Sequence, residues 1–181
     1  AEAAARTLIE WIGDDPNREG LIETPERLVR AFEDFFVGYK QKPEDVLDRT
    51  FGEIGTFDDM VLVRDIPFFS YCEHHFVPII GKAHVAYIST GKVIGLSKIN
   101  RIVQYYAKRP QVQERLTEQI ARELRETLDT DDVAIIIDAK HLCVSSRGVQ
   151  DTASSTITSH YGGKFAGEST KQEFLKYIYN D

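Results

Sequence analysis

The spacing of apolar side chains changes near Met60, and this change limits the folds open to the chain. Up to residue 57 the pattern is helical. Beyond it, β-branched and aromatic residues dominate four segments that we predict to be strands, 60–70, 82–89, 133–143 and 152–161. Helices followed by strands are typical of an α+β protein. We therefore predict an N-terminal helical region, 1–57, and a domain built on an antiparallel sheet, 58–181.

Helices also occur within the predicted sheet domain. The pattern predicts a helix over 100–128 that is broken or kinked at Pro110, because proline removes a backbone donor and clashes with the preceding turn. Residues 171–178 predict a closing helix. In the N-terminal region, four residues form an apolar stripe at helical spacing: Leu28, Ala31, Phe32 and Phe35.

Local signals refine these boundaries. Thr24 followed by Pro25 predicts a helix N-cap with proline at the first helical position. Residues 43–49 predict a short turn of helix. The stretch S-T-G-K, 89–92, predicts a hairpin turn that leads into a strand at 93–96.

Composition excludes several classes of protein. The chain has 181 residues and a formal net charge of −7, which argues against non-specific nucleic-acid binding because that needs a broad basic surface. The negative net charge does not exclude a small anionic ligand, since a few convergent basic side chains can form a local positive pocket. No apolar run is long enough to cross a bilayer. Two cysteines cannot form a disulfide framework, so we expect a cytoplasmic protein.

Both cysteines of the chain have histidine neighbours. Cys72 and His75 form C-x-x-H, with His74 between them, and His141 and Cys143 form H-x-C. The C-x-x-H donors are close enough in sequence to bind one ion, and His141 and Cys143, two apart on a predicted strand, point to the same face. Thiolate and imidazole donors suit zinc and disfavour magnesium and calcium. The sequence therefore predicts a zinc site.

Two other interpretations of these residues stay open at this point. Each cysteine could be an ordinary buried core residue, although two clusters that hold both cysteines make this less favourable. If Cys72, His75, His141 and Cys143 all ligate, the site is closed and structural. With three ligands it keeps an open position for water, which is the catalytic arrangement.

Basic and polar side chains near a predicted helix start indicate an anion site. Ser97, Lys98 and Arg101 lie in G-L-S-K-I-N-R, and free backbone N–H groups at helix N-termini bind anions. Arg147, four residues after Cys143, is expected near the metal and could bind the same anion. For any single Lys or Arg, a solvated surface position is the simpler interpretation.

A second helix start carries Gln113 and Glu114. A carboxylate at a helix N-terminus is often only a favourable partner of the helix dipole. A buried glutamate that faces a pocket would instead match two parallel N–H donors, such as those on the edge of guanine.

Taken together, these segments resemble GTP cyclohydrolase I. Four long motifs in order carry the resemblance, which extends from D-P-N-R-E-G-L-I-E-T-P-E-R to the closing helix: C-E-H-H-F, V-I-G-L-S-K-I-N-R-I-V-Q, R-P-Q-V-Q-E-R-L-T-E-Q-I and H-L-C-V-S-S-R-G-V. The resemblance implies the tunnelling fold, in which antiparallel sheets of several subunits close into a barrel. It also implies a homodecamer with active sites at subunit interfaces.

The resemblance implies a role for each candidate residue. Cys72, His75 and Cys143 would hold zinc, and His74 and His141 would be catalytic acid/base groups. Water activated by zinc would attack C8 of GTP, giving formate and 7,8-dihydroneopterin triphosphate at the entry to folate or tetrahydrobiopterin synthesis. Glu114 with Gln113 would hold the guanine edge. The triphosphate would be held by a basic and hydroxyl set: Ser97, Lys98, Arg101, Arg147 and Arg27.

Two rival functions are weighed against this one. One is a non-enzymatic binding module stabilised by a four-ligand zinc, and the other is a tunnelling-fold enzyme that acts on a different purine or pterin. Formate release from GTP, followed by pterin fluorescence after oxidation, discriminates all three.

Overall fold

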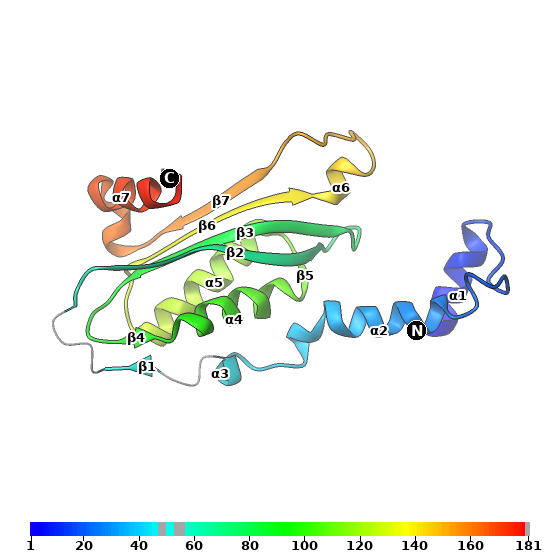
Figure 1. The fold of residues 1–181 in the computed structure, drawn as a ribbon, viewed down its shortest axis with the longest axis horizontal. Helices are drawn as coiled ribbons and strands as arrows, with labels where there is room; N and C mark the ends of the chain where they lie inside the picture. Colours follow the sequence, from blue (N-terminus) through cyan, green and yellow to red (C-terminus); the bar gives the residue numbers. More distant parts are fainter. Residues whose placement is uncertain (47–49, 53–56, 180–181) are drawn as a thin grey trace.

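The computed structural model describes residues 1–46, 50–52 and 57–179 (Figure 1). Its α-helices are α1 (Glu2–Trp11), α2 (Thr24–Phe35), α3 (Pro43–Val46), α4 (Leu96–Ala107), α5 (Gln113–Leu128), α6 (Leu142–Ser145) and α7 (Glu168–Tyr179), with 3₁₀ turns η1 (Val37–Tyr39) and η2 (Gly163–Ala166). Its strands are β1 (Thr50–Phe51), β2 (Met60–Cys72), β3 (Pro78–Ile88), β4 (Val93–Ile94), β5 (Pro110–Gln111), β6 (Val133–His141) and β7 (Thr156–Tyr161).

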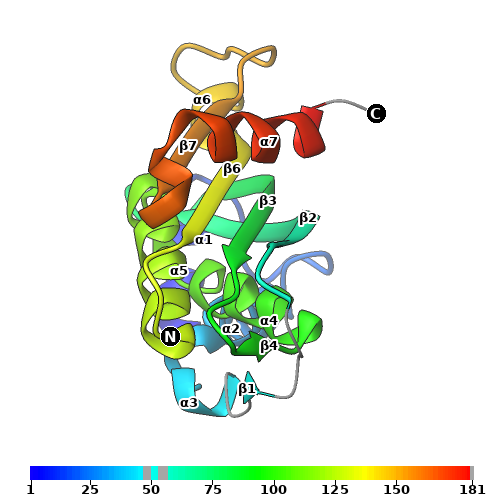
Figure 2. The ribbon, with the colours of Figure 1, turned by 90° about the vertical axis from the view of Figure 1, so that its left-hand side faces the viewer.

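The main sheet has the strand order β5-β2-β3-β6-β7. Three of its four pairings are antiparallel, and the two-residue strand β5 pairs in parallel with the end of β2. Helices α4 and α5 cover one face, and α7 lies against the other (Figures 1 and 2). The predicted α+β class with an antiparallel sheet is confirmed.

The main core lies between the sheet and the helices α4 and α5. Ala83, Val85 and Tyr87 of β3 point into it and are almost fully buried. Alternate residues of β3 point to the other face, where Ala86 and Ile88 pack in a second cluster with Phe174 of α7. Because α7 covers this end of the sheet, the strands here are apolar on both faces, which explains their continuous apolar runs.

The break at Pro110 is confirmed. Helix α4 ends at Ala107, residues 110–111 extend as β5, and α5 begins at Gln113. Strand β5 pairs Pro110 with Tyr71 and Gln111 with Cys72. The break therefore fixes the N-terminus of α5 beside the end of β2, where the first predicted zinc ligand lies.

The N-terminal helices α1 and α2 extend away from the sheet (Figure 1). No residue of α2 is buried, and in its predicted stripe Phe32 is exposed. The N-cap of α2 is Glu23 and not Thr24, whose hydroxyl donates instead to the Gly20 carbonyl at 3.5 Å. The helical region is thus stabilised mainly by α1–α2 packing and by its connection to the sheet domain.

Gly38 makes that connection. Its N–H donates to the Lys108 carbonyl (3.1 Å), and its carbonyl accepts from the Arg109 guanidinium (2.9 Å). A Cβ at this position would lie 2.4 Å from the Tyr105 carbonyl oxygen and 2.6 Å from that of Lys108. Both clashing atoms belong to the backbone of α4 and the residue after it, so they cannot move aside cheaply.

We therefore expect Gly38→Ala to lower the free energy of unfolding by about 1–3 kcal/mol through overpacking. Gly52→Ala is the matched control, because a Cβ there meets only the Gly91 carbonyl at 3.9 Å. Its effect should stay within about 0.5 kcal/mol. Urea unfolding of both variants measures the difference, and equal midpoints would contradict the packing argument.

The predicted hairpin at 89–92 is wrong. Strand β4 pairs with β1 in a separate two-stranded sheet and not with β3. A turn is nevertheless present: the Ser89 hydroxyl donates to the Lys92 carbonyl (2.9 Å) and accepts from the Gly91 N–H (3.2 Å), with Gly91 at φ +102°. The side chain of Ser89 closes the turn in place of strand pairing, which directs the chain away from β3.

Two predictions on the N-terminal half are tested only in part or not at all. Residues 43–46 of the expected short helix are helical, whereas 47–49 lie outside the described residues. The division into 1–57 and 58–181 stays a prediction. Across the described residues, none of the helices has the length and apolar character needed to cross a membrane.

Candidate metal centre and substrate site

The turn between β2 and β3 presents the first candidate ligands. The Cys72 N–H donates to the Val77 carbonyl (2.9 Å), and the Cys72 carbonyl accepts from the N–H groups of His75 (3.3 Å) and Phe76 (2.8 Å). Phe76 has φ +51°, a left-handed conformation that is uncommon for a bulky residue. This tight turn brings His75 back over Cys72, so the C-x-x-H spacing places both side chains together.

Cys143 reaches the same place from another element. Strand β6 ends at His141, and Cys143 lies in the one-turn helix α6 that follows. The expectation that His141 and Cys143 share a strand face is therefore wrong. The register pairs Ile79 of β3 with His141, which sets the start of α6 beside the β2–β3 turn.

Three donor atoms converge here. The side-chain ligand atoms of Cys72, His75 and Cys143 all lie within 4.8 Å of one another, and no other His, Cys, Asp or Glu of the described residues joins them. Cys72 is buried, Cys143 half-buried and His75 exposed. Burial, together with the adjacent Cys72 thiol, raises the pKa of Cys143. A raised pKa means that forming the thiolate of Cys143 is unfavourable. A bound divalent cation would offset this effect, because it stabilises thiolates.

The neighbours of this triad are His74 and Arg147. The Nδ1 atom of His74 lies 3.7 Å from Sγ of Cys72, so His74 is beside the triad without being part of it. The Arg147 guanidinium donates to Nε2 of His75 at 2.9 Å. The structure thus brings Arg147 to the candidate metal centre, as the sequence predicts.

His141 does not join the three donors. Its Nε2 atom lies 2.7 Å from the amide oxygen of Gln113, at the start of α5. Burial lowers the pKa of His141, and the nearby Glu114 carboxylate acts weakly in the opposite direction. The arrangement agrees with a three-donor site that has His141 at its side better than with a closed four-donor site.

Gln113 and Glu114 are adjacent but have different surroundings. Gln113 is 1% exposed and hydrogen-bonded within the chain, whereas Glu114 is exposed. The expectation of a buried Glu114 is therefore not met within one chain. Its carboxylate is on the surface near His141.

The candidate phosphate-binding residues lie elsewhere. Ser97, Lys98 and Arg101 are in the first turns of α4, next to β4, at the end of the sheet opposite α6 (Figure 1). At 1.5 Å per residue, about 15 Å of helix separates Lys98 from Lys108, which adjoins β5. One chain does not bring these residues to the triad. Arg27 is exposed on α2 and ion-paired with Glu23.

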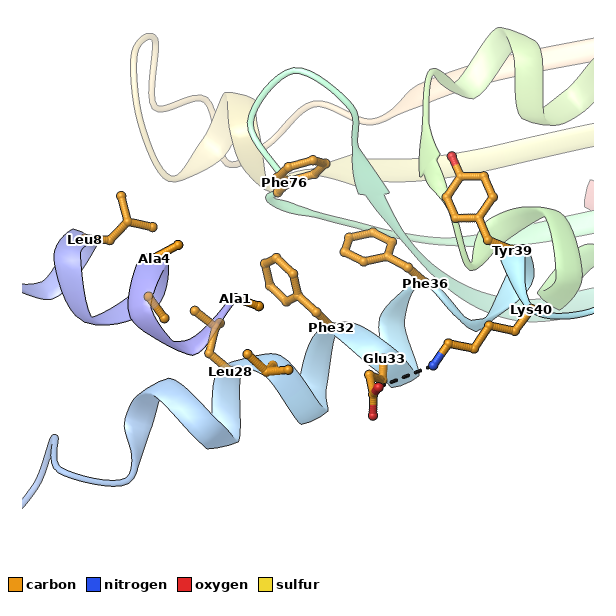
Figure 3. Close-up of a pocket in the computed structure, with 12 residues that line it drawn as sticks. Ala1, Ala4, Leu8, Leu28, Phe32, Glu33, Phe36, Tyr39, Lys40 and Phe76 are labelled. Carbon is orange, nitrogen blue, oxygen red and sulfur yellow. Dashed lines mark hydrogen bonds and ion pairs between the residues drawn. The ribbon is translucent and has the colours of Figure 1, made fainter.

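An aromatic cluster beside the metal turn was not anticipated from the sequence. The ring of Phe76 packs against Phe32 of α2 and against Phe36, the residue after α2, and Phe35 stacks on Tyr71 of β2 at 4.5 Å between centroids. Phe76 also borders an apolar groove of about 650 Å³ between α1 and α2 (Figure 3). The helical spacing of Phe32 and Phe35 was a signal in the sequence for this cluster. Their partners Phe76 and Tyr71, however, lie about forty residues later in the chain, so the sequence did not reveal the contact.

Comparison with known proteins decides the family. The family model of GTP cyclohydrolase I matches residues 1–179. The chain belongs to the GTP cyclohydrolase I family. It is 50% identical over 181 residues to GTP cyclohydrolase 1 of Allorhizobium ampelinum, covering 99% of this chain and 90% of that protein. It is 52% identical over 172 residues to GTP cyclohydrolase 1 of Brucella canis, covering 95% and 81%. The prediction that the chain is an enzyme of this family is confirmed.

Solved structures give weaker similarities. The apo crystal structure of an archaeosine synthase QueF-Like aligns with a TM-score of 0.47 and 14% identity, covering 56% of this chain and 90% of that chain. A dihydroneopterin aldolase from Burkholderia thailendensis bound to guanine aligns with a TM-score of 0.36 and 14% identity, covering 58% and 92%. Both likenesses are too weak to support an argument.

Proposed function

We propose that this protein converts GTP and water to 7,8-dihydroneopterin triphosphate and formate, the carbon of the formate being C8 of the guanine ring. One observation carries the proposal: a chain matched by this family over residues 1–179 brings Cys72, His75 and Cys143 within 4.8 Å of one another. We further propose that the product enters folate or tetrahydrobiopterin synthesis and that the protein is cytoplasmic.

Zinc is the metal that this donor set fits. Two thiols and one imidazole match the soft and borderline ligands that zinc prefers, and three protein ligands are the catalytic number. When bound, zinc supplies Lewis-acid chemistry and makes water nucleophilic near neutral pH.

Histidines flank the proposed zinc site on two sides. His74 lies against Cys72, and His141 is held by Gln113 at the start of α5. Opening the imidazole ring of guanine and releasing formate both require protons to move onto nitrogen and off oxygen. Imidazole groups perform such transfers near neutral pH. We assign these transfers to His74 and His141.

The base and the phosphates need separate contacts. We propose that the carboxylate of Glu114 accepts hydrogen bonds from the guanine N–H groups, because it is exposed, close to His141 and at the start of α5. Arg147, which is beside His75, is placed to meet the negative charge of the triphosphate. The acidic net charge of −7 makes a nucleic-acid partner unfavourable.

A neighbouring copy of the chain is proposed to complete the triphosphate site. Ser97, Lys98 and Arg101 are separated from the triad by the length of α4 within one chain, so a second subunit has to supply them. This agrees with the homodecameric barrel that the resemblance implies, in which sites lie between subunits. Among the described residues, the side chain of Arg27, on α2, pairs with Glu23, a contact that does not support a phosphate role.

The direct test is an assay with GTP. Zinc-loaded protein is incubated with GTP, formate is quantified, and the product is oxidised and examined for pterin fluorescence. We expect both signals, and we expect chelation of zinc to abolish them. A zinc-stabilised binding module would give neither signal, and an enzyme specific for another purine or pterin would leave GTP intact.

The assignment of Glu114 gives a specific prediction. Glu114→Gln presents an amide donor where two N–H donors need an acceptor, which removes two charge-assisted hydrogen bonds worth about 1.5–3 kcal/mol each. We expect kcat/KM for GTP to fall by roughly two orders of magnitude or more. The control is Glu126→Gln, also exposed on α5, which should be neutral. Unchanged kinetics in Glu114→Gln would mean that Glu114 only interacts with the helix dipole.

A further inference from the structure

The side-chain amide of Gln113 has only one possible orientation. Its nitrogen lies 3.1 Å from the Ile137 carbonyl, 2.8 Å from the Thr156 carbonyl and 3.1 Å from the Thr158 hydroxyl. Carbonyl oxygens can only accept, so turning the amide over would set its oxygen against two other oxygens. Because Gln113 is 1% exposed, water cannot relieve that repulsion. The amide oxygen must therefore face away from β6 and β7.

That orientation determines the hydrogen bond to His141. The amide oxygen, which can only accept, lies 2.7 Å from Nε2 of His141. A short contact of this kind requires a proton on Nε2. Among the described residues, none forms a hydrogen bond with Nδ1 of His141. The ring is thereby left with one nitrogen held as a donor and the other nitrogen open.

We propose that Gln113 is a positioning residue: it fixes the orientation and tautomer of His141, so that Nδ1 is the nitrogen that exchanges protons with the substrate. This inference rests on the proposed function of His141 and gives Gln113 a role other than contact with guanine. An amide whose nitrogen and oxygen are both engaged in the protein has no donor left for a ligand. Of Gln113 and Glu114, only the exposed Glu114 can then bind the guanine base.

Hydrogen bonds from neighbouring elements fix the position of the Gln113 side chain. The Thr158 hydroxyl that accepts from Gln113 also contacts the Thr117 hydroxyl at 2.7 Å, and Thr117 lies one turn further along α5. The partners of the amide thus come from β6 and β7, and Thr117 of α5 contacts one of them, Thr158. Second-sphere hydrogen bonds of this kind hold a functional side chain in its productive geometry.

The tautomer can be observed directly. The zinc-loaded protein, labelled with nitrogen-15 at histidine, is studied by solid-state NMR at about pH 8.5, two units above an ordinary histidine pKa of about 6.5. His141→Gln assigns the signals. We expect a protonated Nε2 and an unprotonated Nδ1 in the parent protein. A protonated Nδ1 would overturn the proposal.

Kinetics of Gln113→Met provide the second readout. Methionine is close in volume to glutamine, but its thioether sulfur is only a weak acceptor and does not replace the amide oxygen, so we expect a mixture of tautomers in His141. Turnover should fall about 10- to 100-fold with little change in KM for GTP and with zinc content retained. If KM rises and kcat is unchanged, Gln113 contacts the substrate and the positioning role is refuted.

Two further variants keep the test valid if Gln113→Met folds poorly. Thr158→Val removes one of the three acceptors and should give a smaller change of the same kind in the His141 spectrum. Thr117→Val removes a hydroxyl that contacts Thr158 and donates to the Gln113 backbone carbonyl but not to the side-chain amide, and it should leave the tautomer unchanged. Equal spectra in Thr158→Val and the parent, or a tautomer change in Thr117→Val, would count against the proposal.

The outcome is separable from that of the proposed function. If the parent protein released no formate from GTP, the proposed function would fail, whatever the histidine spectrum showed. If formate is released but the His141 tautomer does not respond to Gln113→Met, the proposed function stands and the positioning role fails.

Discussion

Replacing His141 with alanine is expected to lower GTP turnover by about 10²–10⁴, the usual contribution of a positioned general acid or base. Zinc content should be nearly unchanged, and the melting temperature should fall by only a few degrees. The reason is structural: Nε2 of His141 contacts Gln113, and His141 is outside the group of three donors. The variant leaves the buried amide oxygen of Gln113 without this partner, which costs about 1–3 kcal/mol.

The matched control for this experiment is His160→Ala. His160 lies on β7 and pairs with Glu118 at 3.0 Å, away from the three donors. It should keep parental turnover. Metal analysis, a melting curve and formate release on each purified variant give the comparison. Loss of zinc together with loss of stability in His141→Ala would mean that His141 is a fourth ligand and the site a structural one.

Replacing Cys72 or Cys143 with alanine is expected to empty the metal site and abolish turnover. Each substitution removes one thiolate from a set of three donors, and the remaining two cannot replace it. Because Cys72 is buried at the end of β2 and Cys143 lies on α6, the two variants test both sides of the site. We expect zinc per chain to fall to background in each.

Ser145→Ala is a suitable control, since Ser145 is on the same short helix and, within the described part of the chain, its hydroxyl makes a single long hydrogen bond, 3.4 Å, to the His141 carbonyl. It should bind zinc like the parent. Full zinc occupancy in either cysteine variant would refute the assignment of a shared site. Loss of zinc in one cysteine variant alone would have the same consequence.

Much of the fold follows from local patterns in the sequence. Strands β2, β3, β6 and β7 were found because β-branched and aromatic residues cluster there, and the break before α5 was found because Pro110 cannot continue a helix. The hairpin predicted at 89–92 was wrong because strand pairing depends on distant partners. Val93 pairs with Phe51, some forty residues earlier, and nothing local distinguishes that choice.

Some parts of the candidate site could likewise be predicted from local sequence, and others depend on distant parts of the chain. Cys72 and His75 are close in sequence, so a single turn brings them together, whereas Cys143 required the correct β3–β6 register and the α6 turn. The buried surroundings of Gln113 depend on carbonyl groups of β6 and β7, which no spacing rule could reveal. The distance between α4 and the triad was equally hidden, because it follows from the direction in which α4 runs along the sheet.

The central claim is that this chain removes C8 of GTP as formate. The most direct test uses GTP labelled with carbon-14 at C8, incubated with the zinc-loaded protein until the nucleotide is consumed. We predict that the label appears in formate, one molecule for each GTP, and that the pterin product carries none. Label that stays in the nucleotide, or that appears in the pterin, would contradict the account.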